Sequence, residues 1–275
     1  MDPVVALSES PDAVVRTREL TRDFGALRAV DRVSLAIDAG EVFGLLGRNG
    51  AGKTTIIKML TTLLPITSGS ASVGGFDVTR EAARVRRIIG YVPQALSADG
   101  DLTGYENLRV FAQLYDMPRR EIRTRIGEAL ELMGLTAFAG KLVKTYSGGM
   151  IRRLEIAQST LHRPRVLFLD EPTVGLDPVA RVAVWELLEK LQSRSASAIL
   201  LTTHYLEEAE RLCGRVAIMS AGRVTAMGSP ATLRTALGPG ATFEDVFEHY
   251  TAGSEEAAAA YLATSRVRDS ARRHG

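Results

Sequence analysis

The sequence lacks the features that mark several common classes of protein. A single cysteine, Cys213, excludes a disulfide framework and a cysteine-rich metal site, and it suits a reducing compartment such as the cytosol. No stretch reaches the roughly 20 almost uncharged apolar residues that a membrane-spanning helix needs. The segment 1–11 has neither the basic start nor the apolar middle of a signal peptide. We therefore expect that the chain does not cross a bilayer by itself, although it can dock on a protein that does.

An excess of charge of one sign is also missing. The 34 lysines and arginines face 32 aspartates and glutamates, and the net charge of +2 gives no reason to expect a nucleic-acid partner. With 45% apolar residues, the 275-residue chain can bury the core of one large or two small domains. We expect a flexible N-terminus at 1–13, a main domain at 14–238 and a C-terminal extension at 239–275. Its arginine-rich end, 255–275, is expected to be a solvated helix and a loose end.

The first part of the chain has the periodicity of strands. Residues 14–46 indicate short strands, because Val33, Leu35 and Ile37 alternate with smaller or polar residues. The continuous apolar run 42–46 is typical of a strand buried on both faces. A glycine-rich loop follows, and the pattern then predicts a helix from Thr54 to Leu64.

The rest of the main domain alternates between helices and buried strands. Helical spacing dominates 102–158, and the apolar runs 166–169 and 198–201 predict strands with a helix at 179–193 between them. Strands that are buried and separated by helices favour a parallel sheet covered by helices. The sequence therefore predicts an α/β core with a helical insertion at about 97–155.

A glycine-rich motif joins the buried strand at 42–46 to the helix that follows. Residues 47–54 read GRNGAGKT, which matches G-x-x-x-x-G-K-[ST] in the strand-to-helix setting that this motif requires. Glycines let successive backbone N–H groups point inward at an anion, and the helix N-terminus adds partial positive charge. The motif predicts a site for the phosphates of a nucleotide, against the alternative of a glycine-rich turn with an accidental lysine. The predicted binding residues are Gly47, Asn49, Gly50, Ala51, Gly52, Lys53, Thr54 and Thr55.

Two adjacent carboxylates end the strand at 166–169. Asp170 is placed to hold Mg²⁺ together with the Thr54 hydroxyl, as in nucleotide-hydrolysing proteins of this kind. Glu171 is then placed to polarise a water as general base. On their own these residues fit a helix cap or a salt bridge equally well, and the phosphate motif favours the chemical role.

A third motif narrows the possibilities. Residues 146–150, YSGGM, resemble the LSGGQ signature of the ABC (ATP-binding cassette) ATPases. Ser147 can cap the arginine-rich helix that follows, and Gly148 and Gly149 leave backbone N–H groups open to an anion. An ordinary helix cap explains the three residues alone, but further segments resemble the same family in the same order.

The resemblance covers about residues 14–235. Gln94 ends IGYVPQ, which resembles the Q-loop, and Asp177 lies in GLDP, which resembles the D-loop. His204 ends LTTH, which resembles the switch-histidine strand end, and Phe24 falls where the family has an aromatic that stacks on adenine. Each of these also has a purely structural explanation: a surface glutamine for Gln94, a turn for GLDP, a capping histidine for His204 and a core aromatic for Phe24. The resemblance implies a P-loop NTPase cassette with a RecA-like parallel-sheet core, an antiparallel β subdomain and a helical insertion.

The family's mechanism implies roles for these residues. Two cassettes would pack head to tail around two ATP molecules, as a homodimer if each copy carries the full set of motifs. Lys53, Glu171 and His204 would be catalytic. Thr54, Gln94 and Asp170 would hold Mg²⁺ in the same site. Ser147, Gly148 and Gly149 would reach the γ-phosphate held by the opposite chain.

The sequence departs from the family pattern at three positions. Met150 replaces the usual glutamine, Tyr146 the usual leucine and Arg48 the common proline of the phosphate loop. We expect activity to survive, because the Ser-Gly-Gly core is intact.

The resemblance also implies a partner in the membrane. The helical insertion starts at 101–108, which in the family meets a separate transmembrane permease subunit, so the chain is expected at the cytoplasmic face of the membrane as a peripheral protein. Residues 242–247, TFEDVF, resemble the end of stand-alone cassettes from daunorubicin-type drug and polysaccharide exporters, although a core-packing helix explains Phe243, Val246 and Phe247 equally well. The interpretation is an ATP-hydrolysing subunit of an exporter. The alternatives are an importer subunit and a soluble cassette acting in translation or DNA repair.

Overall fold

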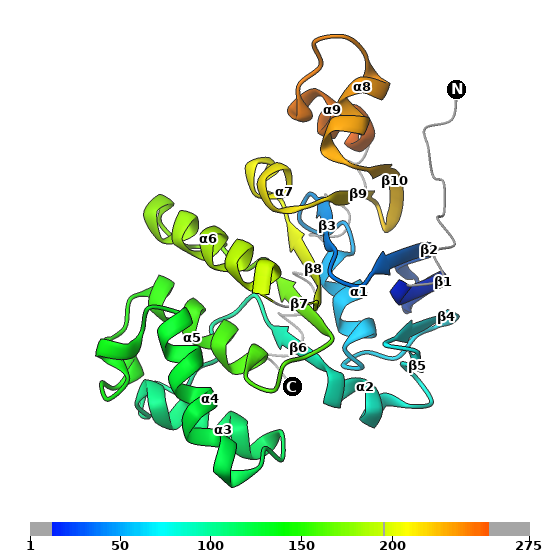
Figure 1. The fold of residues 1–275 in the computed structure, drawn as a ribbon. Coiled ribbons are helices and arrows are strands. Elements are labelled where there is room, and N and C mark those ends of the chain that lie inside the picture. The colour runs from blue at the N-terminus through cyan, green and yellow to red at the C-terminus, as the bar shows by residue number, and fades with distance from the viewer. Residues whose placement is uncertain (1–12, 195, 253–275) are drawn as a thin grey trace, which may run out of the picture.

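The computed structural model describes residues 13–194 and 196–252. The expected flexible N-terminus, apart from Ala13, and the basic end at 255–275 lie outside these described residues. A central sheet carries a second sheet on one side and a group of helices on the other (Figure 1). Among the described residues, no helix is both long and apolar enough to cross a bilayer.

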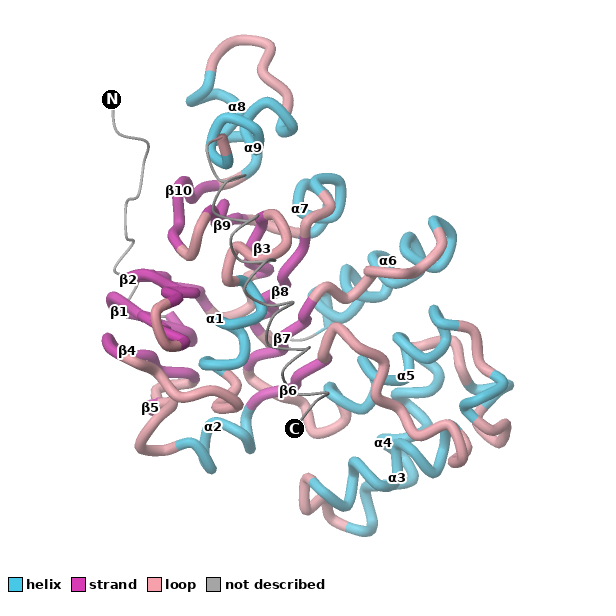
Figure 2. Tube along the Cα trace, turned by 180° about the vertical axis from the view of Figure 1, so that it is seen from behind, coloured by secondary structure: helices cyan, strands magenta, loops and turns pink. Residues whose placement is uncertain are grey.

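The central sheet has the strand order β10-β9-β3-β8-β7-β6. Its strands are β3 (Val42–Gly47), β6 (Ile89–Val92), β7 (Val166–Asp170), β8 (Ala198–Thr203), β9 (Arg215–Ser220) and β10 (Arg223–Gly228). All neighbours are parallel except β9 and β10, and the strands follow one another across the molecule when it is seen from behind (Figure 2). Because β3, β7 and β8 are parallel, their carboxyl ends meet at one edge of the sheet. This edge positions the functional site.

The second sheet is antiparallel, in the order β2-β1-β4-β5. It is made of β1 (Ala13–Phe24), β2 (Leu27–Asp38), β4 (Ser68–Val73) and β5 (Phe76–Asp77). β1 and β2 are long strands of 12 residues each, where the alternation predicted short ones. The predicted parallel core with an antiparallel subdomain is confirmed.

Helices complete the fold. They are α1 (Lys53–Leu60), α2 (Ala82–Ile88), α3 (Gly104–Leu114), α4 (Arg119–Leu132), α5 (Gly148–Thr160), α6 (Pro178–Arg194), α7 (Leu206–Leu212), α8 (Pro230–Leu237) and α9 (Phe243–Thr251), with 3₁₀ turns at Thr136–Phe138 and Val143–Thr145. The helical insertion is α3, α4 and α5, which lie together beyond β6 and β7 (Figure 1).

The prediction of a helix to Leu64 was too long. α1 ends at Leu60, and Thr62 has a left-handed φ of 66°. The N–H groups of Leu63 and Leu64 both donate hydrogen bonds to Lys58 O, at 2.8 and 3.0 Å, so the chain turns back before Pro65. The apolar pattern continues past this turn, which is why periodicity alone missed it.

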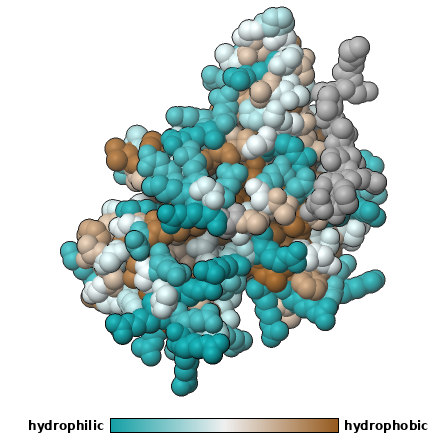
Figure 3. Space-filling model, in the orientation of Figure 1, coloured by the Kyte–Doolittle hydropathy of each residue, from teal (hydrophilic) through white to brown (hydrophobic). Residues whose placement is uncertain are grey.

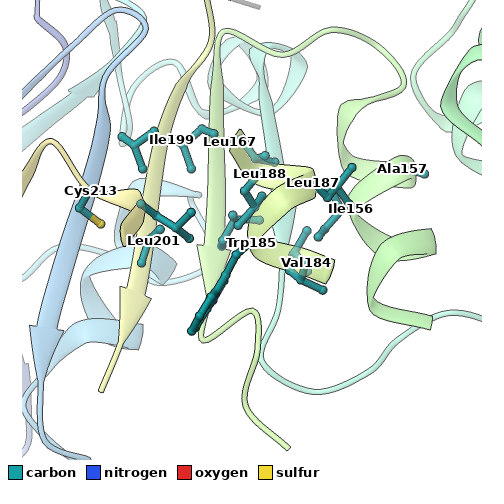
Figure 4. Packing of buried hydrophobic residues seen from close by; sticks show 14 of the residues in the cluster. Ile156, Ala157, Leu167, Val184, Trp185, Leu187, Leu188, Ile199, Leu201 and Cys213 are labelled. Carbon is teal, nitrogen blue, oxygen red and sulfur yellow. The ribbon is translucent and has the colours of Figure 1, made fainter. Parts of the chain in front are cut away.

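Two hydrophobic cores hold the layers together. One lies between the antiparallel sheet, α1 and one face of the central sheet. The other lies on the opposite face, where α6 packs Val184 and Leu187 toward Ile156 of α5, and Leu188 toward Leu167 of β7 (Figure 4). The core-packing helix that was the alternative explanation of residues 242–247 corresponds to α9, in which Phe243 and Val246 are buried and Phe247 is partly buried. On the surface shown in Figure 3, apolar residues are scattered in small groups among hydrophilic ones.

Candidate functional site

The glycine-rich loop between β3 and α1 is wound tightly against the sheets. Gly50 and Gly52 have left-handed φ angles of 86° and 102°. A Cβ on Gly52 would lie 2.5 Å from Ala29 O, and one on Gly47 would lie 2.6 Å from Met219 O. Only glycine fits these positions, because they combine close backbone approach with, at Gly52, a conformation that costs other residues energy. The loop therefore forms the concave turn that the motif predicts.

Lys53 is buried in this loop, with 4% of its side chain exposed. Its Nζ donates to Gly47 O at 2.6 Å and lies 3.2 Å from Glu171 Oε1. Burial lowers the pKa of Lys53, and the charge of Glu171 opposes that shift. The lysine is thus held by the loop carbonyl and by the carboxylate that follows β7.

Asp170 forms the floor of the site at the end of β7. It is 1% exposed, and its Oδ1 accepts hydrogen bonds from Thr54 Oγ1 at 2.9 Å and from Thr202 Oγ1 at 2.7 Å. Burial of the Tyr91 side chain raises the pKa of its hydroxyl to about 12, and the charge of Asp170 adds to that shift. Two oxygen atoms that can act as metal ligands, from Asp170 and Thr54, therefore lie side by side, as the sequence predicts.

Glu171 is held by Thr202, by His204 and, as described above, by Lys53. The backbone N–H of Glu171 donates to Thr202 Oγ1 at 2.9 Å, and its Oε2 lies 2.7 Å from His204 Nδ1. Against an ionised carboxylate, Nδ1 is the donor, which sets the tautomer of the ring. Glu171 also has a left-handed φ of 50°, which is rare for a residue with a side chain and is strained. The strain is held by packing around a site where the carboxylate must point in one direction.

A small pocket of about 200 Å³ opens at this point. Gln94, which follows β6, reaches the pocket from the next strand of the sheet, and Glu171 closes one side. Asp170 and His204 touch the same cluster through Thr54 and Glu171. The structure thus gathers most of the predicted residues at one edge of the sheet. The lining residues are Ala29, Asn49, Gly50, Ala51, Gly52, Lys53, Thr54, Thr55, Gln94 and Glu171.

The predicted signature residues lie elsewhere, at the start of α5. Ser147 is the N-cap, and its Oγ accepts from Met150 N at 3.3 Å. A Cβ on Gly149 would lie 2.8 Å from the Cβ of Ala180, so a side chain there would collide with α6. Asp177 caps α6, since its Oδ1 accepts from Ala180 N at 2.9 Å. The residues of this second group do not line the pocket at the phosphate loop.

Phe24 is the outlying member of the predicted set. It ends β1, at the hairpin where it pairs with Leu27, and it does not line the pocket. The Arg22 guanidinium lies 4.6 Å from the centre of its ring. The ring is thus engaged by a neighbour on its own strand.

Tyr146, which stands where leucine is usual, has a clear structural role. Its hydroxyl donates to Phe138 O at 2.7 Å, and its ring meets the Phe138 ring edge-on. The space for that hydroxyl exists because residue 104 is glycine: a Cβ on Gly104 would lie 2.3 Å from the oxygen. Tyr146 therefore ties the start of α5 to the 3₁₀ turn at Thr136–Phe138, beside the start of α3.

Sequence reasoning missed several residues that build the site. The Thr202 hydroxyl donates to the Asp170 carboxylate and accepts from the backbone N–H of Glu171, and its position in the LTTH segment was the available signal. Glu208 is fully buried and accepts from Thr173 Oγ1 and Trp185 Nε1, both at 2.8 Å. Burial raises the pKa of Glu208, the largest of the influences on it. Nothing in its surface-like helical spacing indicated a buried carboxyl.

The site offers few side chains that could act as ligands to a metal ion. Within 13–194 and 196–252, no cluster of three or more histidine, cysteine, aspartate or glutamate side chains could enclose one. Mg²⁺ at nucleotide sites takes only one or two protein ligands and completes its shell with phosphates and water. The hydroxyl of Thr54 and the carboxylate of Asp170, 2.9 Å apart beside the phosphate loop, fit that requirement.

Comparison with known proteins agrees with this geometry. The ABC transporter family matches residues 30–174. The chain is 44% identical over 232 residues to the daunorubicin/doxorubicin resistance ATP-binding protein DrrA of Streptomyces peucetius, which covers 84% of this chain and 70% of that protein. It is 43% identical over 241 residues to phospholipid-transporting ATPase ABCA3 of Homo sapiens, which covers 85% of this chain but only 14% of that protein.

A solved structure described as the ATP-binding subunit of an ABC transporter has the same fold. The two superpose with a TM-score of 0.77 at 30% identity, over 86% of this chain and 99% of the other. The family match spans more than half of the described chain and includes both the phosphate loop and the carboxylate pair. The chain therefore belongs to the ABC transporter family, as an ATP-binding ATPase cassette.

Proposed function

We propose that this cassette hydrolyses ATP to power a separate membrane exporter, from the cytoplasmic face of the membrane. The observation that carries the proposal is the gathering of Lys53, Thr54, Gln94 and Glu171 around one pocket, with His204 bonded to Glu171. Phosphoryl transfer needs a cation on the phosphates and a base on the attacking water, and this pocket offers both.

The chemistry follows from the positions of the side chains. Lys53 leaves Glu171 and binds the β- and γ-phosphates of ATP, while loop N–H groups bind the remaining oxygens. Glu171 then accepts a proton from a water whose oxygen attacks the γ-phosphorus as the bond to ADP breaks, and His204 keeps the carboxylate aligned. Thr54, Asp170 and Gln94 would hold Mg²⁺, which supplies positive charge to the phosphates when bound.

One chain supplies only half of a closed site. The Ser147 hydroxyl and the N–H groups of Gly148 and Gly149 lie at a helix start that does not line the pocket of the same chain. A helix start of this kind suits the γ-phosphate of a second copy. We therefore infer a head-to-tail homodimer that closes around two ATP molecules and reopens after hydrolysis.

A groove beside the helical insertion suits the permease. It measures about 1020 Å³ and lies between α2, β6 and the α3–α4 turn. Leu63 and Leu114 are 56% and 71% exposed there, and Arg86 and Arg87 lie along the same groove. Exposed leucines next to arginines fit a short amphipathic segment with acidic ends. The groove includes Tyr91, three residues before Gln94, so a partner bound there can sense the nucleotide.

The cargo is inferred from relatives. DrrA is named for daunorubicin and doxorubicin resistance, and ABCA3 for phospholipid transport. Both names point to amphiphilic or lipophilic compounds. We propose export of a drug, an antibiotic, a related lipophilic compound or a polysaccharide.

Two measurements test the proposal. The purified chain should release phosphate from ATP in a Mg²⁺-dependent way, and the tagged chain should co-purify with a multi-span membrane protein. A Leu114→Asp variant should lose the membrane protein and keep its affinity for ADP. Recovery of ribosomes instead of a membrane protein would favour the translation alternative, and failure to bind adenine nucleotides would refute the function altogether.

A further inference from the structure

The helix that begins at Ser147 buries a charged pair on the side that faces the Gln94 segment. Arg152 and Glu155 of α5 are 1% and 3% exposed. Arg152 Nη1 lies 3.0 Å from Glu155 Oε2, close enough for strong attraction although that oxygen makes no hydrogen bond. Burial lowers the pKa of Arg152, and the charge of Glu155 opposes that shift. Charged groups are rarely buried this deeply unless they hold something in place.

Arg152 holds the backbone on either side of the Pro93–Gln94 bond. Its Nη1 donates to Pro93 O at 2.7 Å, and its Nη2 donates to Gln94 O at 2.6 Å. The planar guanidinium fixes the direction of both carbonyls, because its two donors have one fixed geometry. The backbone of the residue whose side chain reaches the nucleotide pocket is therefore attached to α5.

Glu155 holds the next part of the same segment. Its Oε1 accepts from the N–H groups of Ser97 and Ala98, the latter at 3.3 Å, and from Ser97 Oγ at 3.2 Å. These bonds satisfy two backbone donors with one carboxylate oxygen.

The next turn of α5 continues the attachment. Gln158 Nε2 donates to Asn107 Oδ1 at 3.2 Å, and Asn107 Nδ2 donates to Asp99 O at 2.9 Å. Three residues spread over about two turns of α5 thus hold the segment 93–99, the last of them through Asn107.

Stability alone does not account for this arrangement. Removing two charges from water carries a desolvation penalty that two apolar residues would not carry. A buried ion pair is therefore seldom more stabilising than a well-packed apolar pair of similar volume. What the charges supply here is direction: each donor and acceptor faces a particular backbone group of the segment 93–98.

We propose that Arg152 and Glu155 are positioning residues, which fix the Gln94 segment to the signature helix so that both move as one body. The inference rests on the proposed function, because it needs ATP at both places. Gln94 meets the nucleotide of its own chain, and Ser147 meets that of the second copy. Ser147 lies only five residues before Arg152, about 7.5 Å along the helix axis. A shift of Gln94 on nucleotide binding is carried directly to Ser147.

Charge-removing variants of similar length test the link. Arg152→Met and Glu155→Gln should leave ADP affinity within about twofold of wild type, because neither residue lines the pocket. Association of the two copies, driven by a non-hydrolysable ATP analogue and followed by light scattering, should weaken by about tenfold or more, the range of typical coupling between sites. ATPase turnover should fall with it.

The double variant separates positioning from stability. Each single change leaves a lone buried charge and lowers the melting temperature, whereas Arg152→Met/Glu155→Gln leaves none and should recover part of it. Association should stay weak in the double variant. Leu154→Ala, a cavity in the same helix turn, is the matched control: it should melt earlier yet associate normally.

Two results would overturn the inference. One is wild-type association by the double variant. The other is association that simply follows melting temperature in every variant, Leu154→Ala included. A wild-type chain that binds no ADP would instead refute the proposed function, and the positioning role with it.

Discussion

Glu171→Gln tests how strongly Glu171 restrains Lys53. In the structure, Lys53 Nζ lies 3.2 Å from Glu171 Oε1, and both side chains are buried. At an effective dielectric constant of about 20, their attraction is about 5 kcal/mol. Desolvation of the two charges offsets most of it, and the bond from Lys53 to Gly47 O remains in the variant. If about a quarter of the attraction remains after desolvation, the net restraint is about 1.4 kcal/mol, which corresponds to a tenfold change in affinity.

We therefore expect two opposite effects from one substitution. ADP should bind about tenfold more tightly, because Lys53 is released and a negative charge beside the phosphates is lost. Turnover of ATP should fall by at least about 100-fold, because glutamine cannot accept the proton of the attacking water. ADP is the right ligand for the first measurement, since it lacks the γ-phosphate that would bring two copies together.

Calorimetric titration with ADP and a phosphate-release assay provide the two numbers. Glu189→Gln is a suitable control, because Glu189 pairs with Arg211 on the surface and does not line the pocket. It should change neither quantity. Unchanged or weaker ADP binding by Glu171→Gln would show that Glu171 does not restrain Lys53, and undiminished hydrolysis would remove Glu171 from the role of base.

Three further predictions concern other parts of the chain. Lys53→Ala should weaken ADP binding by about tenfold or more in the same titration, and unchanged affinity would contradict the phosphate site. Ser147→Arg should keep ATP binding by the single chain but abolish ATP-driven dimers in light scattering; dimers that persist would place the trans contact elsewhere. His162 has a pKa lowered by burial, and its Nδ1 is buried without a partner. The imidazole therefore takes up a proton more readily in the unfolded chain than in the folded one. The free energy of unfolding should fall as the pH drops below about 6.5, because protonation then favours the unfolded chain. The melting temperature of His162→Phe should vary less between about pH 5 and pH 7 than that of wild type, and equal slopes would refute this.

Much of the site was predictable because its motifs are local in sequence. The phosphate loop has its glycines, Lys53 and Thr54 within eight residues, so the sequence predicts both their contact and their chemistry. Asp170 and Glu171 were predictable as a pair at a strand end. The parallel sheet followed from buried apolar runs separated by helical spacing.

What escaped prediction depends on distances between elements. Lys53 pairs with Glu171, and Thr202 bonds the Asp170 carboxylate and the Glu171 backbone, because β3, β7 and β8 end at one edge in a fixed register. Likewise, Arg152 is buried because the Gln94 segment folds over it, and the arginine-rich composition of α5 does not reveal this. Hydrophobic periodicity describes one helix or strand at a time and carries no information on contacts between elements that are distant in sequence.

The contact between Gly104 and Tyr146 has a consequence for how the family varies. The tyrosine oxygen occupies the volume where a Cβ of residue 104 would lie, and its bond to Phe138 O keeps it there. The two positions can therefore change safely only as a pair: alanine at 104 demands a shorter residue at 146, and leucine at 146 leaves room at 104. Across homologues, co-variation between these two columns should trace the joint between the start of the helical insertion and the start of α5.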